Sequence, residues 1–231
     1  MGTKPPPAEL AALTEEIIDC RRCPRLVEWR ERVAREKRAA YRDQEYWGRP
    51  LPGFGDPDAQ LLVVGLAPAA HGGNRTGRFF TGDRSGDWLY EAMWEGGFAS
   101  QPTSRRLDDG LELWDAYVVA ALRCAPPENK PTTEERDNCE PFLRREWELL
   151  PRVRVVVPLG GFAYASVARV SGLRPRPAFG HGVETALPTG EMVVCSYHPS
   201  QQNTFTGKLT RDMFVRIFRR AREIIESGQE T

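Results

Sequence analysis

Leu61-Leu62-Val63-Val64-Gly65-Leu66 is an unbroken apolar run about as long as one β-strand. Three similar runs lie further along the chain, at 117–122, 153–159 and 192–197. Runs that are apolar without alternation are typical of strands covered on both faces, as in parallel sheets. Crossover helices are expected between the runs at 86–96, 133–149 and 160–170, and a closing helix at 209–226. The pattern predicts an α/β fold: a three-layer α/β/α sandwich with a central four-stranded parallel sheet.

The length and composition favour one domain over residues 1–231, because 231 residues with 40% hydrophobic side chains suffice for one core. Within it, residues 1–55 are expected to form an N-terminal helical arm, with helices at 8–19 and 24–42. No run approaches the roughly 18 apolar residues of a membrane helix, and residues 1–5 lack the apolar core of a signal peptide. The expected setting is therefore the cytoplasm, without membrane contact.

The five cysteines point to metal binding rather than to disulfides, because a reducing compartment keeps thiols free. Cys20 and Cys23 form a C-x-x-C pair, and Cys124 and Cys139 follow much later in the chain. Four thiolates can hold an iron–sulfur cluster or a zinc ion, and such a site would tie the arm to the body. Cys195 lies within an apolar run and is interpreted as a small core side chain.

The net charge is zero, with 32 basic and 32 acidic side chains, but the charges are unevenly placed. The segment 71–86 contains three arginines and one aspartate, and the segment 195–211 contains no acidic side chain. The planar arginine side chain suits bidentate contacts with phosphate, although a charge-rich composition is also typical of thermal adaptation. Arg75, Arg78 and Lys208 are the candidate phosphate contacts in these segments.

Three loops follow the first, second and fourth apolar runs, at 67–83, 123–131 and 198–204. Ligands of open parallel sheets bind beyond the carboxyl ends of the strands, so these loops are expected to meet at one site. The first loop is not a nucleotide fingerprint, because it contains neither G-x-G-x-x-G nor the P-loop pattern. Asp83 could serve there simply as a helix N-cap. His198 is held by the proline that follows it, which suits a hydrogen-bond donor aimed into the crevice.

The same loops carry a resemblance to a known family. The segments GLAPAAHGGNRTGRFFTGD (65–83), RCAPPENKPT (123–132) and HPSQQNTFTG (198–207), together with the four cysteines, resemble the uracil-DNA glycosylase superfamily. The match is best with its type b (family 5) bacterial and archaeal enzymes and extends from Cys20 to the last helix. It implies the same α/β/α fold. Because related families hold a 4Fe-4S cluster on four cysteines, the resemblance favours that cofactor over zinc, with these ligands: Cys20, Cys23, Cys124 and Cys139.

The resemblance implies a monofunctional DNA glycosylase that flips uracil out of DNA and hydrolyses its glycosidic bond in base excision repair. In such a site His198 donates a hydrogen bond to the base carbonyl, and Phe80 stacks on the flipped base. Sister families place an acidic or polar residue within the first motif to orient the attacking water. The motif here, with Gly65 and Ala67, has no such residue, so Asp83 is the expected substitute.

Ala120 marks a second departure, because sister families carry an asparagine that reads the uracil edge at that place. A site that lacks this polar partner discriminates less, since wrong bases leave fewer buried groups unpaired. We therefore expect excision of deaminated purines such as hypoxanthine as well as uracil. Asn129 is the candidate catalytic substitute, as a base reader or a ligand of the water.

The loop after His198 is expected to enter the minor groove and fill the gap left by the flipped nucleotide. Gln201 and Gln202 lie where relatives insert a side chain, and Ser200 and Asn203 are expected to contact the substrate beside them. The expected partner is uracil-containing DNA, double- or single-stranded, met by a monomer at the nucleoid. Two alternatives stay open. One is a non-catalytic iron–sulfur DNA-binding protein. The other is a nucleotide-processing hydrolase, which is disfavoured because paired magnesium-binding carboxylates and a phosphate-loop lysine are missing.

Overall fold

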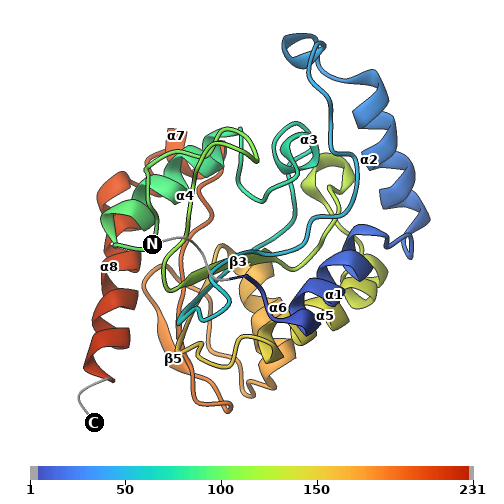
Figure 1. The fold of residues 1–231 in the computed structure, drawn as a ribbon. Helices are drawn as coiled ribbons and strands as arrows, with labels where there is room; N and C mark the ends of the chain where they lie inside the picture. The colour runs from blue at the N-terminus through green and yellow to red at the C-terminus, as the bar shows by residue number, and fades with distance from the viewer. Residues whose placement is uncertain (1–4, 229–231) are drawn as a thin grey trace.

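A computed structural model describes residues 5–228, so the expectation for residues 1–4 lies outside the described residues. Its centre is one sheet of six strands in the order β1-β3-β2-β4-β6-β5 (Figure 1). The strands are β1 (Phe54–Gly55), β2 (Leu61–Gly65), β3 (Ala116–Ala120), β4 (Val155–Pro158), β5 (Glu184–Ala186) and β6 (Met192–Val194). The four apolar runs form β2, β3, β4 and β6, which are all parallel, as predicted.

The predicted count of four strands is wrong, because two short antiparallel strands extend the edges of the sheet. β1 pairs with β3, and β5 pairs with β6. β1 has only two residues, one of them a glycine, and β5 is partly exposed. Neither carries the continuous apolar run that identifies a buried strand, so hydrophobic patterning passes over them.

The helices agree with the predicted ones at six places. They are α1 (Ala8–Ile18), α2 (Pro24–Glu36), α4 (Arg84–Glu95), α5 (Thr133–Glu148), α6 (Gly161–Ser171) and α8 (Arg211–Ser227). Three short elements were not predicted: α3 (Gly73–Thr76), α7 (Gln201–Phe205) and the 3-10 turn η2 (Pro127–Asn129). A further 3-10 turn, η1 (Ala39–Tyr41), lies within the predicted helix 24–42. The predicted helix 24–42 ends early, because Lys37 adopts a left-handed backbone with φ 55°.

The three-layer sandwich is confirmed by the way the strands divide their side chains between two cores. In β2, Leu61 and Val63 pack with residues of α4 and α8. Leu62 and Val64 point to the opposite face and pack with residues of α1, α5 and α6. Successive side chains of a strand face opposite sides, so a run that is apolar at every position needs helices on both. Figure 1 shows these two helical layers around the sheet.

Within the N-terminal arm, α1 packs with α5 on one face of the sheet, and α2 lies against the carboxyl edge. Leu26 of α2 is buried with Ala121 and Leu122, which directly follow β3. Cys195 is buried in the second core, as the sequence predicts. Among residues 5–228 no helix is both long and apolar enough to cross a membrane.

A buried ion pair joins this edge to helix α5. The side chains of Arg123 and Glu146 are each 1% exposed and form an ion pair. Glu146 also accepts a hydrogen bond from the backbone N–H of Gly53, at 2.8 Å. Two charges removed from water in this way stabilise the fold only while both are present, because either one alone would be an uncompensated buried charge.

We expect Glu146→Ala to lower the free energy of unfolding by about 3–5 kcal/mol, because it leaves the Arg123 guanidinium buried without an anion. Urea denaturation of purified protein measures the change. Glu148→Ala is the matched control on the same helix, since Glu148 is exposed and should change stability by less than about 0.5 kcal/mol. Equal midpoints for the two variants would contradict a structural role for the pair.

Candidate functional site

A cavity of about 520 Å³ opens at the carboxyl edge of the sheet, where the three loops meet. We call it the central pocket. It is lined by Leu66, Ala67, Ala69, Phe80, Asp83, Arg84, Ser85, Asn129, His198, Ser200, Gln201 and Gln202. The prediction that loops distant in sequence converge on one site is therefore confirmed, and Phe80, Asp83, Asn129 and His198 all line it.

Phe80 owes its position to two glycines. It is 8% exposed and has a left-handed backbone with φ 53°, which is unfavourable for a bulky residue. A Cβ added to Gly65 would lie 2.7 Å from the Phe80 ring, and one added to Gly86 would lie 1.8 Å from the Phe80 carbonyl oxygen. These contacts leave no room for side chains, so both glycines let the ring sit over the end of β2. Its centroid lies 6.0 Å from that of His198.

The imidazole of His198 titrates below its usual range. Burial lowers the pKa of its imidazole from 6.5 to about 4, because the charged form is poorly solvated. At neutral pH the ring therefore carries no charge and offers one N–H. Asn203 stands behind it and donates from Nδ2 to the His198 carbonyl oxygen, at 2.9 Å. Asn203 thus supports His198 and is not among the residues that line the central pocket.

Asp83 combines the two roles that its sequence position allows. It is the N-cap of α4, since Oδ1 accepts a hydrogen bond from the Gly86 N–H at 3.0 Å. It also lines the central pocket. Burial raises the pKa of its carboxyl, and hydrogen bonds from the N–H groups of Gly86 and Ser85 partly offset that effect. The result is a carboxylate that is fixed in position and holds a proton more tightly than an exposed aspartate does.

Several other predicted residues lie at or below the pocket. Gln201 and Gln202 are exposed on its rim, and Ser200 beside them caps α7 by accepting a hydrogen bond from the Asn203 N–H at 3.4 Å. Gly65 and Ala120 are paired at the ends of β2 and β3 and are buried, so they form the layer under Phe80. Lys208 is exposed and holds its ammonium 4.7 Å from the Tyr197 ring.

The prediction that Arg75 and Arg78 contact phosphate is wrong, because both guanidinium groups are turned into the protein. Arg75 is 8% exposed and bonds to Gln44 and to the Gly82 carbonyl oxygen. Arg78 is 2% exposed and donates to Ser104 and Asp109. Their hydrogen bonds hold the first loop in shape, so neither presents its charge to a ligand.

Three of the four predicted ligand cysteines share one hydrophobic cluster. Cys23, Cys124 and Cys139 pack around Leu26, and Cys20 belongs to the neighbouring cluster of Leu13, Ile17 and Phe142. All four are free thiols. Burial raises the pKa of Cys124 to about 11 and that of Cys139 to about 12, so without a bound positive centre these two sulfurs keep their protons at neutral pH.

The hydrogen-bond partners of Arg30 show whether the surroundings of these cysteines fit an iron–sulfur cluster. It is 2% exposed, and its guanidinium donates to Cys124 Sγ at 2.9 Å and to the Cys20 carbonyl oxygen at 3.1 Å. No hydrogen bond joins it to a carboxylate among residues 5–228. A buried cation needs an anion, and cysteine thiolates on a cluster would supply one. The donor set therefore fits.

Within the described part of the chain, no group of three or more His, Cys, Asp or Glu side chains is arranged so that it could hold a metal ion.

Comparison with known proteins identifies the family to which this fold and pocket belong. A model of the uracil-DNA glycosylase superfamily matches residues 52–222. The chain belongs to this superfamily. The resemblance carried by the three loop motifs is thus confirmed.

The relatives separate into two types. The type-5 uracil-DNA glycosylase of Mycobacterium tuberculosis is 53% identical over 219 residues, which cover 94% of this chain and 81% of the relative. That of Thermus thermophilus is 50% identical over 214 residues, covering 92% and 97%. A type-4 uracil-DNA glycosylase of Archaeoglobus fulgidus is 31% identical over 134 residues, covering 53% and 59%. The chain is thus similar to the type-5 proteins along nearly its whole length.

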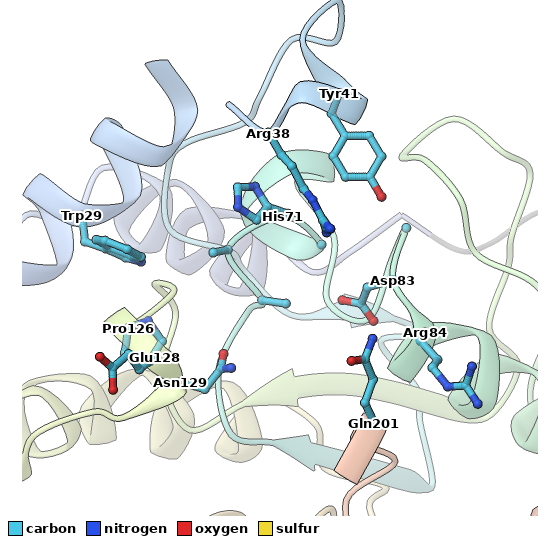
Figure 2. A pocket seen from close by; sticks show the side chains of 14 residues that line it. Trp29, Arg38, Tyr41, His71, Asp83, Arg84, Pro126, Glu128, Asn129 and Gln201 are labelled. Carbon is cyan, nitrogen blue, oxygen red and sulfur yellow. The ribbon is translucent and has the colours of Figure 1, made fainter. Parts of the chain in front are cut away.

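A second cavity, about 380 Å³ in volume, adjoins the central pocket; its lining residues are drawn in Figure 2. We call it the arm groove. It shares with the central pocket Ala69, Asp83, Arg84, Asn129 and Gln201. Its opposite wall consists of Trp29, Arg38 and Tyr41 from the arm and His71 from the first loop. Sequence reasoning missed the three arm residues, because they lie some fifty residues before Asp83; the only signal was two aromatic rings in a highly charged segment.

Proposed function

We propose that this chain is a monofunctional DNA glycosylase that flips uracil out of DNA and hydrolyses its N-glycosidic bond, the first step of base excision repair. The observation that carries the proposal is the central pocket, where Phe80, Asp83 and His198 face one cavity at the carboxyl edge of the sheet. The type-5 relatives are named uracil-DNA glycosylases and are about half identical to this chain, which supports the same substrate.

The pocket suits a base that has left the duplex. An enzyme cannot reach the glycosidic bond inside the base stack, so the nucleotide must turn into a cavity outside it. The ring of Phe80 offers a flat apolar surface for the flipped base, and loop side chains such as Asn129 and Ser200 offer polar groups around it. Gln201 and Gln202, on the rim, are placed to enter the space that the base vacates.

The chemistry requires stabilisation of opposite charges. When the bond from C1′ to the base nitrogen breaks, its electron pair leaves with the base and the sugar becomes an oxocarbenium ion. The N–H of neutral His198 is proposed to donate to the base carbonyl as negative charge grows there. The Asp83 carboxylate stabilises the sugar cation and orients a water, whose oxygen bonds to C1′ while Asp83 takes its proton. The products are the free base and an abasic sugar.

Asp83→Asn should lower the rate of uracil excision by about 10²–10⁴-fold, because the amide cannot accept the proton of the attacking water. Asparagine is as good an N-cap as aspartate, so α4 should keep its start and the fold its stability. The assay is alkali cleavage of an oligonucleotide that contains one uracil. In the wild type the rate should fall as the pH drops through the Asp83 pKa, which burial raises above 3.8.

The control for this experiment is Glu95→Gln, at the end of the same helix, because Glu95 is exposed and does not line the central pocket. It should retain the wild-type rate. DNA binding by a wild-type protein that never produces alkali-labile sites would instead support the non-catalytic iron–sulfur DNA-binding alternative. Metal-dependent release of phosphate from nucleotides would support the hydrolase alternative.

We also propose that Cys20, Cys23, Cys124 and Cys139 hold a 4Fe-4S cluster with a structural role. The cluster would tie the chain just before α2 to the segment from Cys124 to Cys139, and so fix the arm on the body. When bound, it would place negative charge on the sulfurs. Arg30 would then have its anion, and the Asn138 side chain, 3.6 Å from Cys23 Sγ, would donate a further hydrogen bond.

Protein that holds the cluster should be brown. Cys23→Ala should abolish this colour and lower the melting temperature, because one ligand of four is lost and the arm is released. Cys195→Ala is the control: Cys195 is a free cysteine buried in another core, away from the four proposed ligands, so this variant should keep the colour. Analysis of wild-type protein should find iron and acid-labile sulfide in equal amounts. Zinc without sulfide, or a Cys23→Ala variant that keeps its colour, would contradict the assignment.

Base selectivity is proposed to be relaxed. Ala120 is buried under Phe80 and brings no polar group to the pocket, so the polar lining comes from loop residues such as Asn129 and Ser200. We expect the wild type to excise hypoxanthine as well as uracil, since few buried groups would be left unpaired by the larger base. Alkali cleavage of oligonucleotides that contain one uracil, hypoxanthine or xanthine measures the excision of each base. The Asp83→Asn variant gives the background level of cleavage. Uracil excision with complete inertness to hypoxanthine would contradict the proposal.

A further inference from the structure

The arm groove adjoins the central pocket. The two cavities share five lining residues, among them Asp83 and Asn129, so one molecule can occupy both. Figure 2 shows the arm residues Trp29, Arg38 and Tyr41 on one side of the groove and Asp83, Arg84 and Gln201 on the other. A nucleotide flipped into the central pocket stays joined to its strand, and these walls offer a path for that strand.

The charges of the groove favour a phosphate. The guanidinium of Arg38 makes no hydrogen bond or ion pair within residues 5–228, and that of Arg84, on the opposite wall, lies over the Phe205 ring at 4.2 Å. Both side chains are exposed. The acidic groups nearby are Asp83, whose pKa is raised, and Glu128, which pairs with Lys130 at 2.9 Å. Arg38 thus differs from Arg75 and Arg78, because its charge is available to a ligand.

Trp29 adds a wall that can contact a base or sugar. Its ring lines the groove, and the guanidinium of Arg32 lies 4.9 Å from the ring centroid.

The arm side of the groove is held firmly against the first loop. The Tyr46 hydroxyl and His71 Nδ1 are 3.0 Å apart, and the backbone N–H of Trp47 donates to the Arg75 carbonyl oxygen at 2.9 Å. The buried guanidinium of Arg75 lies 4.0 Å from the Tyr41 ring centroid. The groove therefore has a preformed wall, which reduces the cost of ordering it around a ligand.

We propose that the arm groove is a subsite for the DNA strand next to the flipped nucleotide, with Arg38 on a flanking phosphate and Trp29 against the adjoining nucleotide. The inference rests on the proposed glycosylase function. It gives the arm a second task, since the segment that carries Cys20 and Cys23 would also bind substrate. One phosphate contact should account for about 0.9 of the slope of log affinity against log salt concentration.

The test is binding of a duplex that contains one 2′-fluoro-deoxyuridine, whose glycosidic bond resists hydrolysis, measured by fluorescence anisotropy at several salt concentrations. Arg38→Ala should weaken binding about 3- to 10-fold and reduce the salt slope by about 0.9. Arg42→Ala is the matched control, because Arg42 is an exposed arginine of the same arm that does not line the groove. Thermal melting should show that both variants are folded as the wild type is.

A neutral methylphosphonate, placed in turn at the two phosphates on either side of the uridine, locates the contact. At one position the difference between wild type and Arg38→Ala should disappear, because the charge that Arg38 contacts is already gone. Equal affinities of Arg38→Ala and Arg42→Ala would overturn the subsite even in a protein that excises uracil. A loss specific to Arg38→Ala in a protein that leaves uracil in place would keep the subsite and overturn the glycosylase.

Discussion

The parallel alignment of β2, β3, β4 and β6 is the constraint on which the site depends. Parallel strands end at the same edge of a sheet, so the loops that follow them must share that edge. Phe80, Asn129 and His198 come from three such loops, yet line one cavity. The antiparallel strands at the margins, β1 and β5, widen the sheet without altering this edge.

Burial then sets the chemistry of the groups that the sheet brings together. The same removal from water lowers the pKa of His198 and raises that of Asp83, because in each case it disfavours the charged form. In the proposed reaction, the neutral imidazole donates to the departing base without a prior protonation, and the carboxylate with its raised pKa accepts a proton more readily. Both properties depend on the surroundings of the two side chains and not on the residue type alone.

The arm connects the cysteines to the pocket. Arg30 donates to the sulfur of Cys124, while its own carbonyl oxygen accepts from Asn74 Nδ2 at 3.3 Å, in the first loop. Trp29, its neighbour in α2, lines the arm groove. A structural cluster at this place would therefore do more than stabilise a terminus. It would hold one wall of the cavity through which the substrate strand is proposed to pass.

Hydrophobic patterning predicted the layers, the four parallel strands and the buried Cys195, and the order of the strands predicted the convergence of Phe80, Asp83, Asn129 and His198. Periodicity and chain order are local properties, and they fix which strand ends share an edge. The arginines that face a ligand became apparent only from the folded chain. Arg78 is buried by Ser104 and Asp109, and Arg38 is left exposed beside a groove. The exposure of a charge depends on partners far away in the chain, and no local pattern records them.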